Sequence, residues 1–328
     1  MTTTQQLVQG ENTMQVIGYL AQNNLKKGTT NDGRNYINGN IEVKVSDNEQ
    51  YRIDYFTMEK KSNGEPNKIY ESLETAMNKV SLADIANNAE YADQKPAYVQ
   101  ASGSLDINDW YSEATDQVNS FPKLSGLFLR EARPDKEGNL PKPQATFRVA
   151  GFISKKFLDE ESESMKFTLM NVDFRGNLIP VELTTYGSGV EFIESVETGE
   201  PVYIYGEMEN IFERVEKLVE MEGGFGEPEV RVETKTKREW VAKGGRPLPP
   251  EQFNYDDVEL VRTAVAQRET MLSGKKDEFL KRKKGGAGSN AFTNVTKSKD
   301  PLATFTSGNE AREKVDTDEL GDLFANFS

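Results

Sequence analysis

Residues 15–22 read QVIGYLAQ, and residues 148–155 repeat this pattern as RVAGFISK. Each stretch reads as a short strand with a glycine at its centre and an aromatic residue after it. A second pair, KPAYVQASGSL at 95–105 and EPVYIYGEM at 200–208, combines a strand that begins with proline and a glycine where the strand can bend. Glycine inside a strand marks a bulge or a tight barrel corner, because no side chain obstructs the coiled backbone. The shared order of the two pairs indicates an internal repeat.

Alternating apolar and polar residues fill each half between these glycines. In the first half, residues 41–45 and 51–55 alternate with a period of two on either side of a turn. In the second half, residues 166–169 and 179–184 do the same. A helix is predicted next, over 72–89 in the first half, where Leu73, Met77 and Val80 share one helix face, and over 189–194 in the second. A fifth strand is predicted at 230–241.

This order of strands and helix is that of the oligonucleotide/oligosaccharide-binding (OB) barrel. We therefore predict a mainly β protein with two OB-fold-like five-stranded barrels, a C-terminal amphipathic helix and a disordered acidic tail. The predicted organisation is a flexible N-terminus (1–13), a first barrel (14–112), a connecting segment (113–144), a second barrel (145–243), a helical element with a basic end (244–284), and a disordered linker and acidic tail (285–328).

Composition excludes several kinds of chemistry. The 328 residues include no Cys and no His, which removes disulfides, thiolate or imidazole metal ligands and every triad that contains histidine. Without a phosphate-binding glycine loop or a diagnostic carboxylate spacing, we expect neither enzymatic activity nor a cofactor or metal. The formal net charge is −14, and neither a membrane span nor a signal peptide is apparent, so we expect a cytoplasmic protein, in the host cytoplasm if it is viral.

The repeated glycine-containing strands and the end of the chain together resemble those of a known protein family. Two barrels, a glycine-containing linker and the acidic, aromatic end DTDELGDLFANFS (316–328) resemble phage-type and bacterial single-stranded DNA-binding proteins. Bacterial members usually end in Pro-Phe, whereas Phe327 is followed here by Ser328. The resemblance implies a protein of DNA replication, recombination and repair that coats single-stranded DNA without sequence specificity.

Binding of unpaired strands requires exposed aromatic rings for base stacking and cations along the phosphates. Candidates face outward from the predicted strands or lie in the loop after each first strand, where a Lys-Lys pair recurs. The alternative is that any one of them belongs to an ordinary solvated surface. The predicted residues are Lys26, Lys27, Arg34, Tyr36, Lys44, Arg52, Lys155, Lys156, Tyr203, Tyr205, Lys235, Lys237, Arg238 and Trp240.

The end of the chain is predicted to recruit partner proteins. Its apolar residues follow helical spacing, and acidic residues precede and separate them, which suits docking into a basic groove. The alternative is an acidic end that only maintains solubility. The tail residues are Asp316, Asp318, Glu319, Leu320, Asp322, Leu323, Phe324 and Phe327.

Two further functions remain open from the sequence. One is a barrel-built interaction or structural component without a nucleic-acid role. The other is a carboxylate-dependent enzyme on a β scaffold. Neither the oligomeric state nor a preference between DNA and RNA follows from the sequence.

Overall fold

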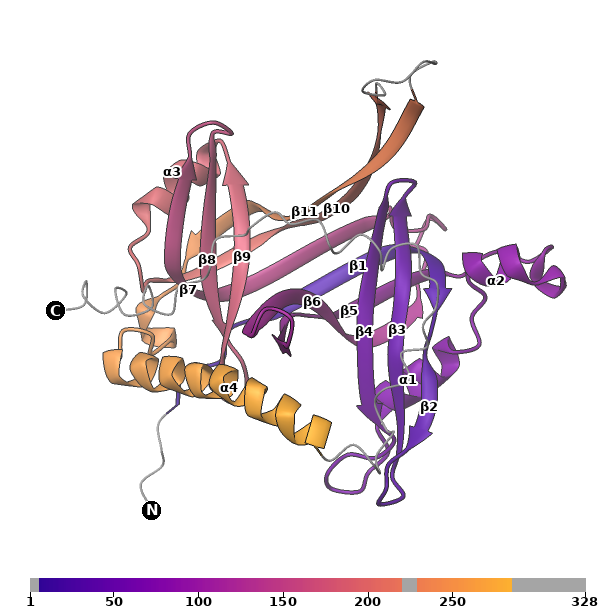
Figure 1. Cartoon of the computed structure of the whole chain (residues 1–328), viewed down its shortest axis with the longest axis horizontal. Coiled ribbons are helices and arrows are strands. Elements are labelled where there is room, and N and C mark those ends of the chain that lie inside the picture. Colours follow the sequence, from indigo (N-terminus) through magenta and orange to yellow (C-terminus); the bar gives the residue numbers. More distant parts are fainter. Residues whose placement is uncertain (1–5, 220–228, 285–328) are drawn as a thin grey trace. The chain divides into compact units, whose positions relative to one another are not determined.

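The computed structural model describes residues 6–219 and 229–284, and it is mainly β (Figure 1). Its strands are β1 (Asn12–Asn23), β2 (Lys26–Thr29), β3 (Asn35–Ser46), β4 (Glu49–Met58), β5 (Tyr98–Ser112), β6 (Gln117–Glu131), β7 (Gln144–Asp159), β8 (Ser164–Val172), β9 (Leu178–Tyr186), β10 (Pro201–Val219) and β11 (Glu229–Pro247). Its helices are α1 (Lys68–Ala76), α2 (Leu82–Asn87), α3 (Ser188–Ser195) and α4 (Val258–Lys284), with short 3-10 turns at Ala89–Tyr91 and Pro250–Gln252.

The first barrel closes through the cyclic order β1-β3-β4-β6-β5-β1. Antiparallel pairs join β1 to β3, β3 to β4 and β5 to β1, while β4 and β6 run parallel where Ile53 registers with Leu124. Alternation in β3 and β4 places Ile41 and Ile53 fully inside. Helix α1 lies between β4 and β5 in the chain and buries Leu73 against this core.

The second barrel repeats this plan. Its order is β7-β8-β9-β11-β10-β7, and its parallel pair is again the third strand with the fifth, where Thr184 registers with Val241. Helix α3 follows the third strand and buries Ile193. Since both five-stranded barrels have the OB strand order with a helical segment between the third and fourth strands, the predicted fold class is confirmed.

Both barrels belong to one compact unit that ends at Arg268. Strand β1 pairs with β7, so that Asn12 registers with Val149 and Ile17 with Gln144, and the two barrels share a continuous sheet. A second unit combines the β5–β6 tip, Trp110–Val118, with the part of α4 from Glu269 to Lys284. Within this second unit the Tyr111 and Phe279 rings lie 5.3 Å apart.

The four glycines that define the repeat lie directly against the backbone of a neighbouring strand. A Cβ atom at any of them would fall within about 2 Å of a backbone carbonyl oxygen on the adjacent strand, far inside van der Waals contact. The equivalences hold pair by pair. An added Cβ would lie 2.2 Å from the carbonyl oxygen of Lys44 at Gly18 and 2.2 Å from that of Met170 at Gly151. At Gly103 it would lie 1.9 Å from the carbonyl oxygen of Ser125, and at Gly206 2.0 Å from that of Val241.

The structure places several elements differently from the sequence prediction. Residues 113–144, predicted as a connecting segment, contain β6, which is the fifth strand of the first barrel. The strand escaped prediction because residues such as Phe121, Leu127 and Phe128 are apolar but exposed, so the alternation is irregular. The helix predicted over 72–89 is two helices, since Ser81 caps a new helix through a capping box with Asp84.

The two ends of the first unit also differ from expectation. Residues 1–13 were predicted to be flexible, yet Leu7 is buried and Asn254 hydrogen-bonds the backbone of Gln6 and Val8. Helix α4 begins at Val258 rather than near Asn254, because the Asp257 side chain caps it by accepting hydrogen bonds from the backbone N–H groups of Glu259 and Leu260. The predicted linker and tail at 285–328 lie outside the described residues.

Candidate nucleic-acid interface

Two aromatic rings meet on the outer face of the β3–β4 hairpin. Alternation turns Tyr36 and Asn38 outward on β3, while Phe56 projects from the same face of β4 in register with Asn38. The Tyr36 and Phe56 ring centroids are 5.7 Å apart, with 34° between the ring planes. Phe56 is 58% exposed although it is apolar. The outer face of the hairpin therefore carries a pair of rings, of which Phe56 is exposed and Tyr36 is half-buried.

The short strand β2 extends this face. Gly28 registers with Tyr36, and a Cβ at Gly28 would lie 2.4 Å from the Tyr36 ring, so the ring lies against the β2 backbone. Lys26 registers with Asn38 and is exposed. Within the described residues Lys26 forms no ion pair. We define Lys26, Tyr36, Asn38 and Phe56 as the Tyr36–Phe56 surface.

The other cations predicted in the first barrel are paired with carboxylates. Arg52 contacts Asp54 on the same strand at 3.2 Å, next to the Tyr36–Phe56 surface. These pairs are exposed, and such pairs contribute only about 0–1 kcal/mol each, so a phosphate can compete for the cation. The remaining pairs are Lys27 with Glu74, Arg34 with Asp32 at 2.7 Å and Lys44 with Asp47 at 2.8 Å.

Two of these pairs are reflected in carboxyl pKa values. The Lys44 hydrogen bond holds the pKa of Asp47 below its usual value, and hydrogen bonds from Thr30 and then Arg34 do the same for Asp32. Both carboxylates are therefore charged at neutral pH. The field of each cation is partly cancelled close to the strand that carries it.

The recurring Lys-Lys pair has a structural explanation. Lys155 and Lys156 lie within β7, not in the predicted loop, beside the bulge between Ile153 and Lys155. Lys156 Nζ donates to the backbone oxygens of Ile193 at 3.1 Å, Glu194 at 3.2 Å and Val196, at the C-terminal end of α3. In the first barrel, Lys27 pairs with Glu74 on α1. The second lysine of each pair thus fastens the helix of its own barrel.

Lys156→Ala is therefore expected to lower the free energy of unfolding by about 1.5 kcal/mol, because charge-assisted bonds to the last carbonyls of a helix are lost. Chemical denaturation measures this change. Lys166→Ala is the matched control, since Lys166 is exposed on β8 of the same barrel and, among the described residues, pairs only with Asp159 at 3.3 Å. Equal stability of the two variants would contradict the role given to Lys156.

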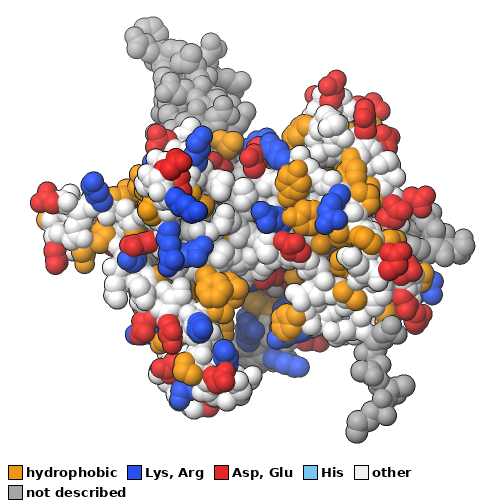
Figure 2. Space-filling view, turned by 180° about the vertical axis from the view of Figure 1, so that it is seen from behind, with side chains coloured by type: hydrophobic (Ala, Val, Ile, Leu, Met, Phe, Trp, Pro, Cys, Tyr) orange, Lys and Arg blue, Asp and Glu red, His pale blue; other side chains and the backbone are white. Residues whose placement is uncertain are grey.

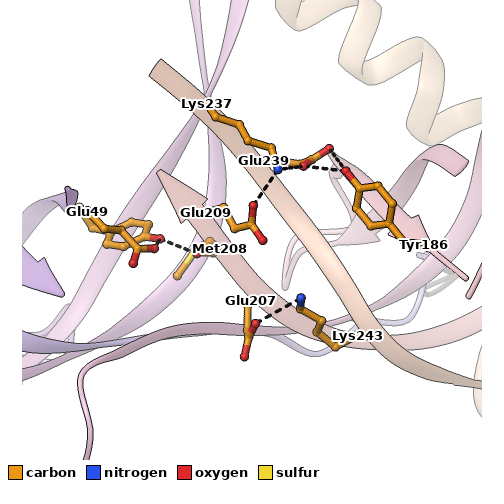
Figure 3. Close-up of polar contacts among 9 residues, drawn as sticks. Glu49, Tyr186, Glu207, Met208, Glu209, Lys237, Glu239 and Lys243 are labelled. Atoms are coloured by element: carbon orange, nitrogen blue, oxygen red, sulfur yellow. Dashed lines mark hydrogen bonds and ion pairs between the residues drawn. The ribbon is translucent and has the colours of Figure 1, made fainter. Parts of the chain in front are cut away.

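In the second barrel, Lys237 is enclosed by acids. Its Nζ lies 2.9 Å from Glu209 and 2.9 Å from Glu239, and the hydroxyl of Tyr186 donates to Glu239 at 3.1 Å (Figure 3). Hydrogen bonds to Glu209 and then Glu239 raise the pKa of Lys237. Burial acts to raise the pKa of Glu239, but hydrogen bonds, first from Lys237, outweigh it and lower that pKa. The positive charge of Lys237 is therefore neutralised by two carboxylates of its own barrel.

Three neighbouring predictions on β11 have different outcomes. Trp240 is half-buried and packs against the core, which leaves its ring less accessible than predicted. Arg238 is exposed and lies 5.8 Å from the ring centroid of Phe121 on β6. The side chain of Lys235 lies outside the described residues.

Tyr203 and Tyr205 project from the outer face of β10, as predicted. Their ring centroids are 6.3 Å apart, and Tyr205 is 48% exposed. Glu207, the next outward residue on β10, is paired with Lys243 at 3.4 Å (Figure 3). Figure 2 shows one face of the molecule, on which hydrophobic, basic and acidic side chains are interspersed.

Four exposed side chains close to the predicted binding residues are not predicted from the sequence: Phe56 on β4, Phe121 on β6, Arg148 on β7 and Arg246 on β11. The signal for Phe56 was present, because the alternation that turns Arg52 and Asp54 outward continues to Phe56. The same alternation predicts that Arg148 faces outward, because it precedes the buried Val149 in the strand pattern of residues 148–155. Phe121 could not be found, since β6 was not recognised as a strand.

Two kinds of site are not found in the described part of the chain. No group of three or more acidic residues is placed there to hold a metal ion. None of the described helices is both long enough and apolar enough to span a membrane.

Comparison with known proteins gives a family and a structural likeness. Wild-type single-stranded DNA binding protein from Thermus aquaticus is 11% identical, with a TM-score of 0.43 over 74% of this chain and 95% of that one. A deletion mutant of that protein has the same identity and TM-score and is covered over 98% of its length. No curated protein is a significant match. A family model described as YorF matches residues 11–278, which include both barrels and most of α4, and the chain therefore belongs to the YorF family.

Proposed function

We propose that this protein binds single-stranded DNA without sequence specificity. The observation that carries the proposal is the contact between half-buried Tyr36 and exposed Phe56 on the outer face of the β3–β4 hairpin of a closed barrel, with Lys26 beside it. The β-hairpin of the second and third strands is the face on which OB barrels bind oligonucleotides. Aromatic rings on that face offer π surfaces that every base can stack on.

The chemistry of this surface favours unpaired strands. Stacking on Tyr36 or Phe56 requires a base whose face is free, which a duplex does not supply. Asn38 is the polar side chain between the rings and the lysine, and its amide can donate or accept. A surface of two rings and one amide selects for an unstacked base and tolerates its identity.

The pairing of the cations sets the expected salt dependence. For a single strand, log K falls with log salt by about 0.7 for each phosphate contact. Lys26 is available at once, whereas Arg52 must exchange Asp54 for phosphate. We therefore expect fluorescently labelled oligo-dT to bind, with a slope of about −1 to −3 between 50 and 300 mM salt. Titration at several salt concentrations measures this slope.

A duplex of equal length is the control in this titration. Absence of binding, or equal affinity for the duplex, would contradict the proposal. A barrel-built interaction component without a nucleic-acid role, which is the alternative function, predicts no salt-dependent binding at all.

The biological setting is also part of the proposal. We place the protein in phage DNA replication, recombination and repair, in the host cytoplasm, where its acidic end recruits partner proteins. Support for this setting comes from the sequence alone, because residues 316–328 lie outside the described residues.

A further inference from the structure

We propose that the second barrel carries a separate stacking surface for an unpaired polynucleotide strand, formed by Tyr203, Tyr205, Arg148 and Arg246. This inference rests on the proposed function and adds a second contact site to it. Tyr203 and Tyr205 lie two residues apart on β10, so they project from one face of the sheet.

The residues around the two rings follow a regular pattern. Tyr203 registers with Arg246 on β11 and with Ala150 on β7, while Tyr205 registers with Arg148 on β7 and with Gly244 on β11. Each ring therefore has an arginine on one neighbouring strand and a small residue on the other. For Tyr203 the arginine is on β11, and for Tyr205 it is on β7. Tyr205 is exposed and Tyr203 is half-buried, and the arginines supply positive charge on both sides.

Local contacts hold the rings in place. The guanidinium of Arg246 lies 5.5 Å from the ring centroid of Tyr203. A Cβ at Gly244 would lie 2.3 Å from the hydroxyl oxygen of Tyr205, so this ring lies across the β11 backbone. The rings are thus positioned before any ligand arrives, which lowers the entropic cost of stacking a base on them.

The two arginines of this surface differ from Lys237 of the same barrel in their ion pairing. Arg148 is exposed, and neither Arg148 nor Arg246 forms an ion pair with a described residue, unlike Lys237 between its two glutamates. The nearest outward acid on β10, Glu207, is already paired with Lys243. Two guanidinium groups without carboxylate partners suit phosphate, to which arginine binds in a bidentate manner.

A second copy of the chain is a poorer occupant of this surface. Tyrosine and arginine are also common in protein interfaces. A pairing of two identical faces, however, would bring Arg148, Arg246 and Lys243 of one chain close to the same cations of the other. An unpaired strand instead supplies bases for the rings and phosphates for the arginines.

The test uses full-length protein and labelled oligo-dT of about 30 nucleotides, long enough to reach more than one barrel at roughly 4–16 nucleotides per OB fold. Tyr205→Ala is expected to weaken binding roughly tenfold, whereas Tyr205→Phe keeps the ring and retains binding. Arg148→Ala is expected to reduce the salt slope by about 0.7. Tyr186→Ala is the matched control, because Tyr186 is 43% exposed on β9 but bonded to Glu239.

The outcomes separate the two proposals. If wild-type protein binds and Phe56→Ala weakens binding while Tyr205→Ala and Arg148→Ala leave it unchanged, the second surface is refuted and the proposed function stands. If wild-type protein does not bind, both fail. If Tyr205→Ala changes the sedimentation of the chain from oligomer to monomer without changing affinity, the surface joins copies of the chain and the inference is wrong.

Discussion

Replacing Tyr36 and Phe56 together with alanine is expected to weaken oligo-dT binding about 100-fold. Each stacked base contributes roughly 1–3 kcal/mol, and the two rings are close enough to act on neighbouring bases or on one base together. Because the effects of contacting residues are not additive, the loss is set at about 2.7 kcal/mol, in the lower part of the summed range. Fluorescence anisotropy at fixed salt measures it.

The slope of log K against log salt is a second measurement that this experiment provides. Both substitutions remove rings and no cation, so the affinity should fall while the slope stays that of the wild type. Lys26→Ala should do the reverse, with a small loss of affinity and a slope lower by about 0.7. A change of slope in the aromatic variant would mean that the hairpin itself had been disturbed.

A matched phenylalanine controls for the loss of apolar surface. Phe174 is 66% exposed in the turn between β8 and β9, compared with 58% for Phe56. Phe174→Ala should leave affinity and stability close to wild type. If Phe174→Ala weakened binding as much as the double variant, binding would not be centred on the Tyr36–Phe56 surface.

The fold was predictable because its determinants are local. Gly18 and Gly151 are visible in sequence as glycines inside strands, and the structure gives the same cause for both, a carbonyl oxygen of the next strand. Strand β6 was not predictable in the same way. Its register depends on Leu124 meeting Ile53 on β4, a partner about 70 residues earlier in the chain.

The site was predictable only in part for a similar reason. Alternation along one strand correctly predicts that Arg52 and Tyr205 face outward, since that property needs no knowledge of other strands. Tyr36, predicted to precede the second strand, lies within β3. The partners of the cations come from elsewhere in the chain: Glu74 reaches Lys27 from α1, and Glu209 reaches Lys237 from the neighbouring strand. Sequence identifies a cation on a face, whereas tertiary structure decides whether a carboxylate already neutralises it.

Gly103→Ala is expected to destabilise the protein by about 3 kcal/mol, the upper end of the usual cost of overpacking. The added Cβ would lie 1.9 Å from the carbonyl oxygen of Ser125 and 2.9 Å from Cα of Gly126, both of which are backbone atoms that no rotamer change can move. Strands β5 and β6 would have to separate, which opens the first barrel. Urea denaturation measures the loss as a lower midpoint.

Two further glycines make this prediction specific. Gly206→Ala places a Cβ 2.0 Å from the carbonyl oxygen of Val241 at the equivalent point of the second barrel, so its effect should match that of Gly103→Ala. Gly274 lies within α4 with no atom near its Cβ position, and Gly274→Ala should stabilise the chain by about 0.5–1 kcal/mol through helix propensity. If Gly103→Ala behaved like Gly274→Ala, strand contact at these glycines would not be what closes the barrels, and the structural equivalence of the two halves would lose its physical cause.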